Sequence, residues 1–116
     1  MERMPISELH RVCHASEIAE GTARSVEIGD RQLALYNIGG TFYATDDRCT
    51  HARAYLSGGF IEGDAVECPL HGGRFHIPTG RPLTPPVRAP VSAYPVQVID
   101  NQLYIQIAAG ENEQEQ

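Results

Sequence analysis

Hydrophobic and polar residues alternate in the first third of the chain in the pattern of an antiparallel β-hairpin. The alternation over residues 26–28 runs up to the pair Gly29-Asp30, and it resumes with Leu33 and Leu35. Period-two alternation predicts strands with one buried face, and glycine readily adopts the positive φ of a tight turn. We therefore expect two strands joined at Gly29-Asp30.

Two further hairpins are expected from the same kind of pattern. Gly39-Gly40 separates the run that ends at Ile38 from the strand-like segment 41–44. Near the C-terminus, Asp100-Asn101 separates the alternating residues 96–98 from residues 103–107. Pairs of glycine, aspartate and asparagine between alternating runs are typical of hairpin turns.

Only one short helical segment is predicted. Ser16 could cap a turn that runs to Glu20, because a serine side chain accepts a hydrogen bond from the backbone at a helix start. The residues before it, Leu9 to Cys13, fit a first strand better than a helix. The predicted class is therefore all-β.

The middle of the chain has a different composition. Residues 46–86 carry many glycines and prolines, which predicts a loop-rich segment. We expect this segment to be inserted into a β base formed by residues 6–45 and 87–108, within a single domain of residues 1–116. The tail 110–116 has no apolar residue and is expected to be disordered.

Composition narrows the choice of partner and compartment. The formal net charge is −6, which argues against nucleic acid, because phosphates select clustered lysine and arginine. The negative surface either docks onto a basic protein partner or is simply solvated, and both interpretations stay open. No apolar run approaches the roughly 20 residues of a membrane span, and the start lacks a secretory signal. We expect a cytoplasmic protein without membrane contact.

Cysteine and histidine are the residues that carry the candidate chemistry. Cys13, Cys49 and Cys68 make an odd count, which argues against a disulfide scaffold and leaves metal ligation or free thiols. Cys49-Thr50-His51 is followed, after 16 intervening residues, by Cys68-Pro69-Leu70-His71. Two thiolates and two imidazoles on two short loops could converge on one metal centre.

Three interpretations of these pairs compete. Chance would give two buried thiols and two hydrogen-bonded histidines, but four ligand-type residues in two matched pairs argue against it. A structural zinc site uses the same donors, although zinc pairs usually join like residues, as C-x2–4-C and H-x3–5-H. A Rieske [2Fe–2S] cluster places two cysteines on one iron and two histidines on the other. That arrangement requires mixed loops, which the sequence has.

The segment CTHARAYLSGGFIEGDAVECPLHGGRFHIPTG resembles the cluster-binding region of Rieske ferredoxins. The likeness runs from about Leu33 to Val96, and it is closest to the ferredoxin component of three-component aromatic-ring-hydroxylating dioxygenases of the naphthalene dioxygenase type. The resemblance implies the Rieske fold, an antiparallel β-sandwich base with an inserted cluster-binding subdomain, and one [2Fe–2S] cluster.

The resemblance also implies roles for single residues. Cys49 and Cys68 would bind the buried iron, and His51 and His71 would bind the iron nearest the surface. The segment 82–86, which is rich in proline, resembles the family's loop that covers the cluster.

The function that the resemblance implies is electron transfer. The protein would accept single electrons from a flavin-dependent NAD(P)H reductase and pass them to a terminal oxygenase, as a monomer that docks with both in turn. Its 116 residues leave no room for the substrate domain of an oxygenase. The alternative is a small Rieske subunit of another redox complex, of the nitrite-reductase type.

The resemblance bears on the reduction potential as well. High-potential relatives in respiratory complexes donate serine and tyrosine hydroxyls to the cluster sulfurs, where this chain has Gly73 and Phe75. Those relatives also link their two loops by a disulfide, at positions that are Ala54 and Leu70 here. We expect a potential in the lower part of the Rieske range, which spans roughly −150 to +300 mV.

Other polar residues are expected to be structural. His76 stands where relatives commonly carry aspartate or asparagine. His10 and His14 bracket Cys13, and we expect a surface histidine pair beside a half-buried free thiol rather than a metal site. Asp46-Asp47 predicts polar turn chemistry, with acidic docking as the alternative.

Overall fold

The structure is a computed structural model, and it describes residues 7–50, 54–70 and 72–108. These residues form three antiparallel sheets, with two single 3-10 turns, η1 (Ala15–Glu17) and η2 (Leu56–Gly58), and no α-helix among them. The strands are β1 (Ser7–His14), β2 (Thr22–Ile28), β3 (Arg31–Ile38), β4 (Thr41–Asp46), β5 (Phe60–Glu62), β6 (Ala65–Glu67), β7 (Arg74–His76), β8 (Pro82–Thr84), β9 (Ala93–Tyr94), β10 (Val96–Ile99) and β11 (Gln102–Ala108). The all-β prediction is confirmed.

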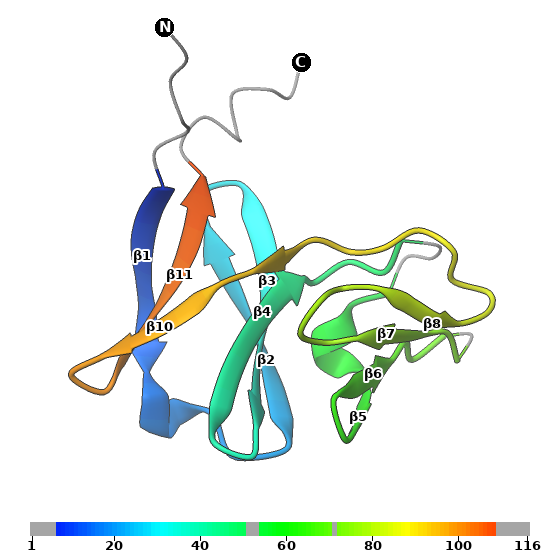
Figure 1. Ribbon diagram of the computed structural model, residues 1–116, viewed down its shortest axis with the longest axis horizontal. Helices are drawn as coiled ribbons and strands as arrows, with labels where there is room; N and C mark the ends of the chain where they lie inside the picture. Colours follow the sequence, from blue (N-terminus) through cyan, green and yellow to red (C-terminus); the bar gives the residue numbers. More distant parts are fainter. Residues whose placement is uncertain (1–6, 51–53, 71, 109–116) are drawn as a thin grey trace, which may run out of the picture.

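Two of the sheets pack against each other. One has the order β1-β11-β10 and the other β2-β3-β4-β9, so strands from both ends of the chain build each of them (Figure 1). The side chains between them form a first core of Cys13, Ile18, Ile28, Leu33, Leu35, Ala44, Tyr94, Leu103, Ile105 and Ile107. No helix in the described part of the chain is long and apolar enough to cross a membrane.

The third sheet, β5-β6-β7-β8, lies to one side of the second (Figure 1). A second core joins it to β3 and to the loops around Cys49 and Cys68. Its members are Ala34, Tyr36, Cys49, Ala54, Leu56, Val66, Cys68, Phe75, Ile77, Val87 and Val91. The third sheet therefore shares a core with the strand that runs through the middle of the molecule.

Strand β3 is buried on both faces, which the sequence pattern did not predict. Leu33 and Leu35 belong to the first core, while Ala34 and Tyr36 belong to the second, and all four are 0% exposed. The expectation of one buried face was wrong because the third sheet covers the other face. Burial also raises the pKa of the Tyr36 phenol, whose oxygen lies 2.8 Å from Thr45 Oγ1.

The predicted hairpin turns are confirmed. Gly29 joins β2 to β3 with φ of 59°, and Gly39-Gly40 joins β3 to β4 with φ of 62° and 92°. Asp100 and Asn101 join β10 to β11 with φ of 52° and 64°. Aspartate and asparagine tolerate this left-handed region better than other residues with a Cβ, so the local sequence specifies the turn.

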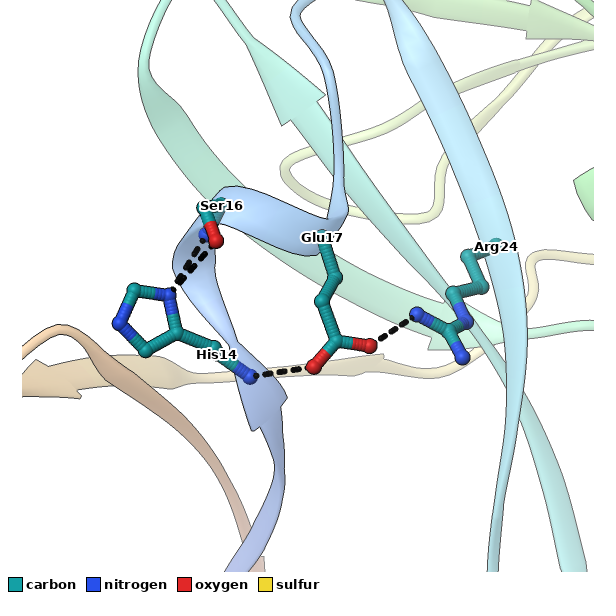
Figure 2. Close-up of polar contacts among 4 residues, drawn as sticks. All are labelled: His14, Ser16, Glu17 and Arg24. Atoms are coloured by element: carbon teal, nitrogen blue, oxygen red, sulfur yellow. Dashed lines mark hydrogen bonds and ion pairs between the residues drawn. The ribbon is translucent and has the colours of Figure 1, made fainter.

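The helical turn lies near its predicted place, but its cap is a different residue. The Nδ1 atom of His14 accepts from the backbone N–H of Ser16 at 3.1 Å, and the Glu17 carboxylate accepts from the backbone N–H of His14 at 3.2 Å (Figure 2). Arg24 of β2 donates to Glu17 at 2.7 Å, and this hydrogen bond lowers the pKa of Glu17. A histidine replaces the expected serine as cap because the turn starts two residues earlier than a turn capped by Ser16 would.

Gly80 offers a test of the packing between the β7–β8 turn and the return segment. Its φ is +79°, and an added Cβ would overlap the carbonyl oxygen of Val91. Gly21 has nearly the same φ, +78°, with nothing within 4 Å of an added Cβ. We expect Gly21→Ala to lower the free energy of unfolding by about 1–2 kcal/mol. Gly80→Ala should lower the free energy of unfolding by about 1–3 kcal/mol more than Gly21→Ala does. Urea denaturation of both variants measures the difference, and equal losses would contradict the overlap.

Candidate metal centre

The first candidate loop starts at Cys49, just after β4. The backbone N–H of Cys49 donates to the carbonyl oxygen of Ala54 at 2.9 Å, and Arg48 forms a β-bridge with Tyr55. These contacts join the two ends of the loop. His51 lies outside the described residues, within the segment that they close.

The second candidate loop has a similar construction between β6 and β7. The backbone N–H of Cys68 donates to the carbonyl oxygen of Gly73 at 2.7 Å, and the N–H of Gly72 donates back to the carbonyl oxygen of Cys68 at 3.3 Å. His71, which also lies outside the described residues, falls between Cys68 and Gly73 in the sequence. Each loop thus begins with a cysteine and closes a few residues later.

The two loop cysteines share one core. Cys49 is 3% exposed and Cys68 is 1% exposed, and both belong to the second core. All three cysteines of the chain lie in the described residues, and none forms a disulfide bond. Two buried thiols at the start of two matched loops, each with a histidine in its sequence, form a donor set that fits a [2Fe–2S] cluster with mixed ligation.

The segment after β8 contacts both loops. An added Cβ on Gly73 would meet Val87 Cγ1 at 2.5 Å, so the backbone of the second loop lies directly against the Val87 side chain. The hydroxyl of Thr50 in the first loop donates to the carbonyl oxygen of Ala89 at 2.9 Å. Gly73 therefore packs directly against Val87, with no room for a side chain at this position.

Asp46 and Asp47 lie where the chain leaves the first two sheets. The carboxylate of Asp46 accepts from Tyr94 Oη at 2.7 Å and from the backbone N–H of Ser92 at 3.1 Å. Asp47 is 0% exposed, which rules out the docking alternative for it. Its burial was missed by sequence reasoning, although Ser57, a donor to it, lies only ten residues further along.

The other candidate residues have structural environments. His76 places Nε2 3.1 Å from Asp64 Oδ2 and Nδ1 2.8 Å from Thr79 Oγ1, so both ring nitrogens are engaged away from the two loops. Cys13 lies in β1, as expected, but it is 5% exposed rather than half-buried, and burial raises the pKa of its thiol. It belongs to the first core, apart from Cys49 and Cys68.

The positions expected to set the potential carry no hydroxyl side chain. Phe75 is 1% exposed in the second core, and Gly73 lies against Val87. Fewer hydrogen bonds to the cluster sulfurs disfavour the extra electron. We expect protein-film voltammetry to return a midpoint potential below about 0 mV, in the lower part of the Rieske range. A value well above that would contradict this reasoning.

Comparisons with known proteins give a consistent result. A family model described as the Rieske [2Fe-2S] domain matches residues 8–95. Ferredoxin CarAc of Metapseudomonas resinovorans is 44% identical over 96 residues, which cover 82% of this chain and 90% of the relative. The ferredoxin component of the naphthalene 1,2-dioxygenase system of Pseudomonas aeruginosa is 45% identical over 92 residues, which cover 79% and 88%.

A solved structure agrees with the sequence relatives. A chain of the complex of reduced oxygenase and oxidized ferredoxin in carbazole 1,9a-dioxygenase matches with a TM-score of 0.78 and 44% identity. The match covers 82% of this chain and 98% of that chain. The similarity therefore extends over nearly the whole length of these proteins.

Proposed function

Since this chain belongs to the Rieske [2Fe–2S] domain family and carries one such cluster, we propose that it carries electrons between a flavin-dependent NAD(P)H reductase and a terminal ring-hydroxylating oxygenase. The protein is an electron-transfer component and not a catalytic oxygenase, like the ferredoxin components that it resembles. The similarity of at least 44% to such components, over most of their length, is the observation that carries the proposal.

The cluster ligands in this proposal are Cys49, Cys68, His51 and His71. The buried positions of the two cysteines suit the inner iron, and the two histidines, which follow them closely in the sequence, would hold the outer iron. When bound, the cluster accepts and releases one electron at a time. The chain's own part is to close both loops by backbone hydrogen bonds and to keep water from the thiolates.

Apolar side chains beside the second loop support a docking role for this end of the molecule. Leu70, which precedes His71, is 55% exposed, and Leu83 of β8 is 43% exposed. Exposed apolar residues next to an electron port are suited to transient contact with a partner. The same face would meet the reductase and the oxygenase in turn, so we propose a monomer.

A cytoplasmic location is part of the same proposal. Three cysteines without a disulfide suit a reducing compartment, in which the electron donor NAD(P)H is also found.

Light scattering on the purified protein would test whether it is a monomer, since a mass near twice 12.7 kDa would contradict that proposal.

Reconstitution tests the proposed function. The reductase and oxygenase of the naphthalene 1,2-dioxygenase system would be combined with NADH and naphthalene, with this protein in place of that system's ferredoxin component. We expect naphthalene oxidation that depends on this protein and that is lost when it is omitted. A preparation that is fully loaded with cluster but supports no turnover, while a large redox subunit co-purifies with it from its native cells, would favour the nitrite-reductase-like alternative.

A further inference from the structure

A buried carboxylate lies next to the first loop and has no role in the function described so far. Asp47 is 0% exposed, and its two oxygens accept three hydrogen bonds. The backbone N–H of Ser57 donates to Oδ1 at 2.8 Å. The Gln32 amide and the Ser57 hydroxyl donate to Oδ2 at 3.0 and 3.1 Å.

These partners indicate that Asp47 carries a negative charge. A backbone N–H and a side-chain amide N–H only donate, so the carboxylate receives at both oxygens and needs no proton of its own. Among the described arginines and histidines, none forms an ion pair with it. Among the residues that the structure describes, Asp47 is thus held by neutral donors, and no ion pair offsets its charge there.

The charge sits close to the loops that hold the candidate ligands. Asp47 precedes Cys49 by two residues, and its carbonyl oxygen accepts from the backbone N–H of Leu56 at 2.6 Å. Leu56 is 0% exposed and lies in the same core as Cys49 and Cys68. The backbone of Asp47 is therefore bonded to the core that holds the two thiols, and all three side chains are buried.

We propose that Asp47 is a potential-setting residue, whose fixed buried charge lowers the reduction potential of the cluster. The proposal rests on the proposed ligands Cys49, His51, Cys68 and His71. Reduction adds one negative charge to a centre that is neutral when oxidised. A nearby anion opposes that addition, and burial weakens the screening that water and salt would otherwise provide. The chain would use this charge, besides the missing hydroxyls at Gly73 and Phe75, to remain a low-potential donor.

Two substitutions test the charge in different ways, one by removing it and the other by placing a cation next to it. Asp47→Asn keeps the shape, and its amide can be accommodated by rotation of the Ser57 hydroxyl and a flip of the Gln32 amide. Gln32→Lys leaves Asp47 in place and supplies a cation beside it. Gln32 is exposed and lines an open hollow of about 520 Å³, which leaves room for the longer side chain.

The measurement is the midpoint potential of each variant, with iron, acid-labile sulfide and the EPR spectrum determined on the same samples. We expect both variants to make reduction roughly three- to tenfold more favourable, which corresponds to a rise of about 30–60 mV for one electron. For Asp47→Asn the rise should persist at high salt, because the charge that is removed is buried. Asp30→Asn, which removes an exposed charge at the β2–β3 turn, should leave the potential unchanged.

The proposal is overturned if both cluster-loaded variants keep the wild-type potential or fall below it. A rise in Asp47→Asn that disappears at high salt, or a rise that Asp30→Asn reproduces, would also overturn it, since net surface charge would then be the cause. Should Asp47→Asn fail to load its cluster, Gln32→Lys decides the question. Wild-type protein without sulfide or an EPR signal would instead refute the ligand assignment, so the two failures are distinguishable.

Discussion

The Cys68→Ala protein is expected to contain no [2Fe–2S] cluster. In the proposed site, one iron is bound to the protein only through Cys49 and Cys68, so the substitution leaves it with a single thiolate. The position is 1% exposed inside the second core, and no neighbouring water or surface side chain can replace the lost ligand easily. Iron and sulfide per chain, together with the visible absorption, should fall to background.

Cys13→Ala is the matched control for this experiment. Cys13 is also buried, at 5% exposure, but it lies in the first core with Leu103 and Ile105. Removing its sulfur costs a small amount of packing, of about 1 kcal/mol, and should leave cluster content unchanged. If Cys68→Ala retained as much cluster as Cys13→Ala, the ligand assignment would be wrong.

The second large effect is expected from the histidines. Replacing both His51 and His71 by cysteine exchanges two neutral ligands for two thiolates. The cluster would then pass from two to three negative charges on reduction, instead of from none to one. The potential of a loaded double variant should fall to about −400 mV, the range of all-cysteine clusters.

His76→Cys controls for the added thiol in that experiment. His76 is bound to Asp64 and Thr79, away from both loops, so its replacement should leave the potential where it is. Voltammetry of the double variant and this control measures the difference. A double variant that keeps the wild-type potential would show that the two histidines do not ligate the cluster.

Local sequence was sufficient to predict the hairpins of this fold. Gly29-Asp30 and Asp100-Asn101 specify their turns through backbone conformations that few other residues adopt, so no distant contact was needed. The burial of Ala34 and Tyr36 could not be predicted in this way. It arises because a sheet from the middle of the chain packs on the second face of β3.

The candidate site shows the same division between local and distant information. The paired motifs at Cys49 and Cys68 could be recognised because each proposed ligand pair is separated by only one or two residues in the sequence. The burial of Asp47 depends on Gln32 and Ser57, which the fold brings to it from another strand and from beyond the loop. The choice of His14 over Ser16 as a cap depended on where β1 ends, a boundary that alternation alone does not specify.

The most direct test of the central claim is the EPR spectrum of the dithionite-reduced protein as purified, with iron and acid-labile sulfide counted on the same sample. We predict two irons and two sulfides per chain, and a rhombic signal with the low average g value of a histidine-ligated [2Fe–2S] centre. A silent spectrum with stoichiometric zinc and no sulfide would contradict the account and make this protein a structural zinc module.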